Sequence, residues 1–197
     1  MIATRPADTS ARRAAIRVPI AQPDDLYARA LAKYARRTYG DVPDNVLVLL
    51  KHRPALKALL GFERRVAKFD RLDGNLKSLA LTASAAMIGC SWCLDFGYYV
   101  AYTQGNDLAK LREVPRWRES GSFTPVERRV FEFSEAMTAT PPTVTDDMVK
   151  ALTRDLGDEA VIELTMMVAI ENERARFNSA LGLTSQGFSA QCALPRE

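Results

Sequence analysis

Two cysteines separated by two residues carry the clearest chemistry in this sequence. Cys90 and Cys93 stand in the run Cys-Ser-Trp-Cys, and the 197-residue chain has one further cysteine, Cys192. A two-residue spacer lets one sulfur attack a partner and the other resolve the product, which is dithiol redox chemistry. The preceding Gly89 can end one helix, so that both cysteines fall in the first turn of the next helix. Free N–H groups and the helix dipole there favour a thiolate.

Two other interpretations of the pair remain open. Two buried thiols at i and i+3 of a helix also occur as plain core residues, because free cysteine is among the most buried residue types. A zinc site needs four ligands, and the others on offer are Cys192 and the single histidine, His52, far apart in the sequence. We favour the redox dithiol and expect no metal and no other cofactor. His52 stands just before Arg53 and Pro54 and is interpreted as a polar residue at a helix end.

Helical patterns occupy nearly all of the chain after residue 20. Apolar residues at helical spacing and helix start and stop signals predict helices over residues 26–39, 55–69, 76–88, 90–104, 107–114, 125–138, 145–157 and 158–181, with one or two apolar turns over residues 45–52. Residues 76–88 are apolar on nearly every side, as in a helix buried at the centre of a fold. No stretch shows strand alternation. The sequence therefore predicts an all-α bundle of about eight helices, several of them short.

Charge is unevenly distributed along the chain. The net charge of +3 comes from residues 1–20, which hold four arginines and one aspartate, while the remainder is balanced. We predict a basic, disordered tail over residues 1–20, one helical domain over 21–188 and a flexible C-terminus over 189–197. Cys192 falls in this last segment and is interpreted as an incidental thiol, with a third exchange partner as the alternative.

Several classes of protein are disfavoured. An odd cysteine count in a chain of this length argues against a secreted disulfide scaffold, and no apolar run has the length of a signal peptide or of a membrane span. Basic pairs such as Arg36-Arg37 and Arg64-Arg65 are interleaved with acidic residues and lack an aromatic stacking platform, so no nucleic-acid partner is predicted. We expect a cytoplasmic protein without a membrane partner.

Three segments resemble a known family. The runs LALTASAAMIGCSWCLDFG, FTPVERRVFEFSEAMT and ELTMMVAIENERARFNSALGL are similar, in this order, to the carboxymuconolactone decarboxylase family and to its alkylhydroperoxidase D-like branch. The resemblance covers about residues 24–188. It implies an alkylhydroperoxidase D-like helical bundle that assembles as a homo-oligomer, a trimer or a multiple of it, with the dithiol helix near a subunit interface.

The resemblance also implies roles for individual residues. Cys93 would attack a small hydroperoxide or disulfide substrate and Cys90 would resolve the product, with a thiol or lipoyl protein as electron donor. Local electrostatics alone favours Cys90 as the attacking thiol, because it lies nearer the helix start. The glutamate and histidine of the peroxidase relay fall on Ser78 and Gly97, and neither residue can replace a proton relay.

Four other side chains are candidates for the missing relay: Asp95, Tyr98, Tyr99 and Glu171. Glu171 is a candidate proton acceptor or structural partner of the dithiol. The alternative is a salt-bridged helix face that it forms with Arg174 and Arg176. Asp95 is interpreted as a helix-stabilising acid at the surface.

Three functions follow from these residues. The first is a thiol-dependent oxidoreductase, a hydroperoxide reductase with an antioxidant role that uses Cys93 and Cys90. The second is a dithiol–disulfide exchange or redox-sensing module, which needs no relay. The third is a decarboxylase of the kind in the family name, which the single imidazole of the chain makes the weakest of the three.

Overall fold

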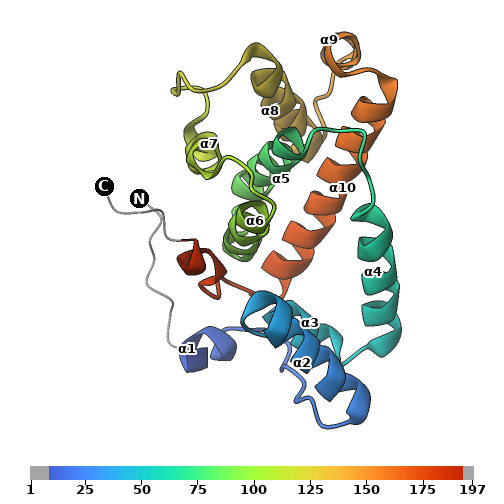
Figure 1. Cartoon of the computed structure of the whole chain (residues 1–197), viewed down its shortest axis with the longest axis vertical. Coiled ribbons are helices and arrows are strands. Elements are labelled where there is room, and N and C mark those ends of the chain that lie inside the picture. Colours follow the sequence, from blue (N-terminus) through green and yellow to red (C-terminus); the bar gives the residue numbers. More distant parts are fainter. Residues whose placement is uncertain (1–8, 193–197) are drawn as a thin grey trace.

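The computed structural model describes residues 9–192, and this part of the chain is helical without strands (Figure 1). The prediction of an all-α fold is confirmed. The helices are α1 (Thr9–Ala14), α2 (Leu26–Tyr39), α3 (Asp44–Leu49), α4 (Arg53–Val66), α5 (Gly74–Ile88), α6 (Ser91–Thr103), α7 (Leu108–Glu113), α8 (Pro125–Thr138), α9 (Asp146–Leu156) and α10 (Asp158–Ala180), with the 3-10 turns η1 (Val114–Arg116) and η2 (Phe188–Gln191). No helix among residues 9–192 combines the length and apolar character that crossing a membrane requires. The sequence predictions for residues 1–8 and 193–197 lie outside the described residues.

Helix α5 forms the centre of the bundle. It packs against α8, α10 and α6, and α10 runs beside it as the longest helix (Figure 1). Leu79, Ala80 and Ala85 are buried on α5 and belong to three different clusters of core residues. This explains why residues 76–88 are apolar on nearly every side: each face of the helix meets a different neighbour.

Helix α4 begins two residues earlier than the sequence predicts. His52 is its N-cap and accepts a hydrogen bond from the Ala55 N–H at Nδ1 (3.1 Å), while Pro54 lies in the first turn. Proline is tolerated there because the first N–H groups of a helix have no partner within it. The interpretation of His52 as a helix-end residue is confirmed.

The N-terminal segment differs from the predicted disorder over the range that the structure describes. Arg12 is buried and its Nε donates to Asp44 of α3 (2.9 Å), and Arg13 Nε donates to the other oxygen of the same carboxylate (3.1 Å). Arg17 donates to the Ala180 carbonyl at the end of α10 (2.6 Å). The prediction was wrong for residues 9–17 because the buried Asp44 carboxylate requires cations, and these arginines supply them.

The C-terminal segment also differs from the prediction. Cys192 is buried in the cluster that contains Ala101 of α6 and Leu111 of α7. Burial, with a smaller contribution from the Asp95 charge, raises the pKa of its thiol above the ordinary value. Cys192 is therefore a core residue, and the segment before it, η2, packs against α6.

Candidate active site

Cys90 and Cys93 form a disulfide at the N-terminus of α6. Gly89 ends α5 in the left-handed conformation (φ 79°), and Cys90 is the N-cap of α6, as the sequence predicts. The Cys93 N–H donates to Cys90 Sγ (3.2 Å), and the two Cα atoms are 5.3 Å apart. The start of the helix thus supplies a backbone donor to the sulfur of Cys90.

Apolar side chains cover the disulfide. Cys90 is 2% exposed and Cys93 is 7% exposed. The buried residues packed with them come from the two end segments and from α3, α5, α6 and α10: Ile16, Val48, Ala85, Trp92, Ala175 and Leu183. A substrate can reach either sulfur only when part of this cover moves aside.

Trp92, between the two cysteines, is held in place on both sides. Its ring stacks on Phe96 at a centroid distance of 5.0 Å, and its Nε1–H donates to Gln186 Oε1 (3.0 Å). The same Gln186 oxygen accepts the Asp44 N–H (2.6 Å). Gln186 therefore links the dithiol helix to α3 through the C-terminal segment.

Asn178 of α10 is the polar side chain at the sulfur of Cys93. Its Nδ2 donates to Cys93 Sγ (3.4 Å), and the residue is 1% exposed. Sequence reasoning missed it. The available signal was its position seven residues after Glu171 and three after Ala175, which places all three on one stripe of α10.

Glu171 lies on that stripe but is not brought to the sulfurs. Its carboxylate accepts a hydrogen bond from Arg174 (3.3 Å), and Arg174 Nε donates to Glu63 of α4 (2.8 Å). No hydrogen bond joins it to Cys90 or Cys93 within the described part of the chain. Burial raises the pKa of Glu171 to about 7, against the opposing effect of the Arg174 charge.

The salt-bridged face that we considered for Glu171 exists in part. Arg174 joins Glu171 and Glu63, whereas Arg176 donates to the Thr138 carbonyl (3.1 Å) on α8. Glu171 therefore has a structural role as a partner of Arg174, and the pKa of its carboxyl group is raised to about 7.

The two relay positions hold no proton-transfer group. The Ser78 hydroxyl accepts a hydrogen bond from Asn106 Nδ2 (2.6 Å). Gly97 is exposed, and a Cβ built on it meets no atom within 4 Å. Position 97 is therefore open to solvent and supplies no imidazole.

The two tyrosines considered for the relay are occupied elsewhere. The Tyr98 hydroxyl donates to the Leu111 carbonyl (2.8 Å), and burial raises the pKa of Tyr98 to about 12. The Tyr99 hydroxyl donates to the Thr38 carbonyl (3.0 Å). Both side chains connect α6 to its neighbours.

Asp95 is buried, and its interpretation as a surface acid was wrong. Its carboxylate accepts the backbone N–H groups of residues 186–189 at 2.7 to 3.1 Å, and also the Ser189 hydroxyl (2.7 Å). Burial alone would raise the pKa of this carboxyl, but the hydrogen bonds from Ser189 and Phe188 bring it below the ordinary value. Asp95 thus fixes the C-terminal segment to the dithiol helix.

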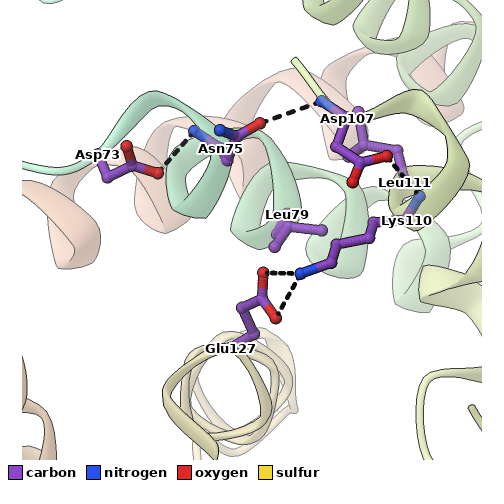
Figure 2. A pocket seen from close by; sticks show the side chains of 7 residues that line it. All are labelled: Asp73, Asn75, Leu79, Asp107, Lys110, Leu111 and Glu127. Atoms are coloured by element: carbon purple, nitrogen blue, oxygen red, sulfur yellow. Dashed lines mark hydrogen bonds and ion pairs between the residues drawn. The ribbon is translucent and has the colours of Figure 1, made fainter. Parts of the chain in front are cut away.

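A polar pocket of about 200 Å³ lies between α5, α7 and α8 (Figure 2). Its charged groups are paired: Lys110 contacts both oxygens of Glu127 (2.8 and 3.0 Å), and Asp73 caps α5. Figure 2 also shows Asn75 accepting the Asp107 N–H (3.1 Å). Among residues 9–192, no group of three His, Cys, Asp or Glu side chains is placed to hold a metal ion. The polar groups of this pocket hold helix ends together, so the dithiol is the candidate active site.

Comparison with known proteins places this site in a family. The model of the carboxymuconolactone decarboxylase family matches residues 53–136, which include both cysteines. The protein YnjA of Escherichia coli is 34% identical over 130 residues, which are 66% of this chain and 70% of YnjA. The chain belongs to the carboxymuconolactone decarboxylase family.

Solved structures support the alkylhydroperoxidase D-like fold within the carboxymuconolactone decarboxylase family. The debrominase Bmp8 in complex with 2,3,4-tribromopyrrole superposes with a TM-score of 0.76 at 18% identity, over 95% of this chain and 97% of Bmp8. An alkylhydroperoxidase AhpD core protein from Ralstonia eutropha has a TM-score of 0.74 at 17% identity, over 89% of this chain and 95% of that protein. At these identities the likeness establishes the fold alone.

Proposed function

We propose that this protein is a thiol-dependent oxidoreductase that reduces small hydroperoxides through Cys93 and Cys90. The observation that carries the proposal is the disulfide between these two residues at the N-terminus of α6, which is the oxidised product of such a reaction. Membership of the carboxymuconolactone decarboxylase family supports an enzymatic role in general.

The proposed reaction has three steps. The Cys93 thiolate attacks one oxygen of the hydroperoxide; an S–O bond forms, the O–O bond breaks, and the alkoxide leaves and takes up a proton as the alcohol. The Cys90 thiol then attacks the Cys93 sulfenic acid, which forms the disulfide and releases water. A dithiol donor, such as a lipoyl protein, returns two electrons and two protons and regenerates both thiols.

We propose Glu171 as the third residue of the site, the acceptor of the proton that Cys93 releases. Its pKa of about 7 means that both protonation states are populated near neutral pH. Because its direct partner is Arg174, proton transfer from Cys93 to Glu171 requires a rearrangement of side chains between α6 and α10. The rate of hydroperoxide reduction, measured against pH, is expected to lose its inflection near pH 7 in Glu171→Gln. An unchanged pH dependence would exclude this role of Glu171.

A second function, dithiol–disulfide exchange or redox sensing without peroxidase activity, is favoured by one observation. Ser78 and Gly97 provide no relay, and Tyr98 and Tyr99 donate to backbone carbonyls. Exchange needs no proton relay, because a thiolate leaves more readily than an alkoxide. The decarboxylase alternative gains no support from His52, whose Nδ1 caps α4.

The deciding experiment is stopped-flow oxidation of the reduced protein by hydrogen peroxide and by tert-butyl hydroperoxide, followed through tryptophan fluorescence, to which Trp92 beside the sulfurs contributes. Cys93→Ser is expected to lower the oxidation rate by more than about a hundredfold, because it removes the attacking sulfur. Cys90→Ser is expected to keep this first step and to accumulate a sulfenic acid at Cys93 that dimedone traps.

Cys192→Ser is the matched control and is expected to react as the wild type does. Full hydroperoxide turnover by Cys93→Ser would contradict the proposal. Slow oxidation of the wild type, together with rapid reduction of its disulfide by dihydrolipoamide, would establish the exchange function instead. Sedimentation velocity of the same samples tests the homo-oligomer, a trimer or a multiple, that the family resemblance predicts.

A further inference from the structure

Among the described residues, the side-chain amide of Asn178 is the one polar group from outside α6 that donates a hydrogen bond to a sulfur of the disulfide. We propose that Asn178 stabilises the thiolate of Cys93 through its Nδ2–H and so makes Cys93, rather than Cys90, the reactive thiol. The inference rests on the proposed function, because it assigns the reacting sulfur of that same site.

The burial of Asn178 calls for a functional explanation. The residue is almost fully enclosed, and within residues 9–192 its Oδ1 has no hydrogen-bond partner. A buried polar atom without a partner destabilises the folded state, so an apolar side chain would give a more stable core. We explain the retained amide by its hydrogen bond to Cys93 Sγ.

An amide suits this position because the sulfur changes its hydrogen-bonding character during the reaction. A thiolate is an acceptor only, and it can take the Nδ2–H of Asn178. A protonated thiol is a weak donor, and Oδ1 of Asn178 can accept its hydrogen bond after a half-turn of the side-chain amide. Asn178 can therefore pair with Cys93 in both protonation states, and its strong pairing is with the charged state.

The backbone donor at Cys90 does not remove this asymmetry. Cys90 Sγ accepts the Cys93 N–H (3.2 Å), which belongs to the helix start. Cys93 Sγ accepts from the Asn178 amide and lies in the first turn of α6, and Cys93 is the more exposed of the two residues. Each sulfur thus accepts one hydrogen bond, but the donor at Cys93 is a side-chain amide that can follow the protonation state of the sulfur, and this offsets the advantage that Cys90 has from lying nearer the helix start.

The test measures the pH dependence of Cys93 alkylation by iodoacetamide in a Cys90→Ser background, with mass spectrometry reading Cys93 and Cys192 separately. Asn178→Leu removes the donor at similar volume. Asn178→Asp keeps the shape and replaces the donor by a negative charge. Both are expected to move the midpoint of alkylation to higher pH and to slow alkylation at neutral pH by about tenfold or more, the Asp variant by the larger factor.

Asn172 provides the matched control on the same helix. Its Nδ2 donates to Thr138 Oγ1 (2.9 Å) and not to a sulfur, so Asn172→Leu and Asn172→Asp are expected to leave the midpoint in place. An unchanged midpoint in both Asn178 variants, or an equal change in the Asn172 variants, would overturn the inference.

A measurement without any substitution at position 178 covers the case in which the variants fail to fold. In the Cys90→Ser protein, the side-chain amide protons of Asn178 are expected to shift in NMR spectra with the same midpoint as Cys93 alkylation. Amide signals that do not titrate would overturn the inference. A wild type that fails to react with hydroperoxide contradicts the proposed function instead, and leaves the assignment of Asn178 standing if the midpoints move.

Discussion

The carboxyl group of Glu171 is buried in α10 with Arg174 as its single hydrogen-bond partner among the described residues. Burial raises its pKa to about 7 in the folded protein. The unfolded chain releases this proton near the ordinary pKa of a glutamate, so folding becomes less favourable as the pH rises between the two values. A group of this kind reduces stability at neutral pH and is tolerated where its proton is useful.

Replacing Glu171 by Gln is expected to remove this pH dependence. Between about pH 5 and pH 8 the free energy of unfolding of the wild type should fall by about 2–3 kcal/mol relative to that of Glu171→Gln, because a neutral amide has no proton to lose. Urea denaturation at a series of pH values measures the difference. Burial alone would raise the pKa of Glu163, but Lys77 and the Arg71 N–H bring it below its ordinary value, so the wild type should lose stability relative to Glu163→Gln only as the pH falls below the ordinary glutamate pKa. Parallel curves for wild type and Glu171→Gln would contradict a raised pKa of Glu171 in the folded state.

At the scale of elements, the C-terminal segment is held to α6 by one carboxylate. Asp95 accepts four consecutive backbone N–H groups from residues 186–189, and so η2 begins at this contact. The lowered pKa of Asp95 means that its contribution to stability is present above the ordinary aspartate pKa and is lost as the pH falls through its lower value in the folded protein. Acid is therefore expected to release this segment from α6.

Asp95→Asn is expected to loosen the segment at neutral pH. The asparagine lacks the charge, and its side-chain NH₂ group would face the backbone N–H groups of residues 186–189. This should lower the free energy of unfolding by about 3 kcal/mol. Hydrogen exchange should show the amides of residues 186–189 losing protection before those of α5. Asp155→Asn, which breaks the surface ion pair with Arg129, is the control and should cost no more than about 1 kcal/mol. Retained protection at residues 186–189 would contradict this account of Asp95.

At the scale of the whole molecule, both end segments meet at the dithiol. Ile16 and Leu183 pack in the cluster that covers the disulfide, and Asp44 anchors the N-terminal side through Arg12 and Arg13. Gln186 accepts hydrogen bonds from the Asp44 N–H and from Trp92, and so links the N-terminal and C-terminal parts of the cover. Figure 1 shows α1 and the C-terminal segment on the same side of the bundle. Access to the sulfurs is therefore coupled to the stability of these end segments.

Asp44→Asn is expected to expose the disulfide. Removing one partner of a buried ion pair costs on the order of 3–5 kcal/mol, because Arg12 is left buried without its counter-charge. If this cost falls on the opening of the cover, the disulfide should be reduced by dithiothreitol about a hundredfold faster or more. Quenched alkylation of Cys90 and Cys93 gives the rate. Asp147→Asn, on the exposed face of α9, should leave it unchanged, and equal rates in all three proteins would show that the cover does not limit access.

Sequence and tertiary structure each decided a different part of this protein. The helices, the break at Gly89 and the placement of Cys90 and Cys93 in one first turn follow from the sequence, because hydrophobic spacing, glycine and cap residues act within a few residues. The role of His52 as a helix cap is likewise local.

Only the tertiary structure decided which polar groups serve the site. Asp95 meets partners 91 to 94 residues away, Asn178 meets Cys93 across 85 residues, and Arg12 meets Asp44 across 32. Neither charge counting nor helical periodicity contains these distances, so Asp95 looked like a surface acid, Cys192 like an incidental thiol in a flexible end and residues 9–17 like part of a tail. Burial changes the chemistry of a charged or polar group through its neighbours, and those neighbours are assembled only when the helices pack.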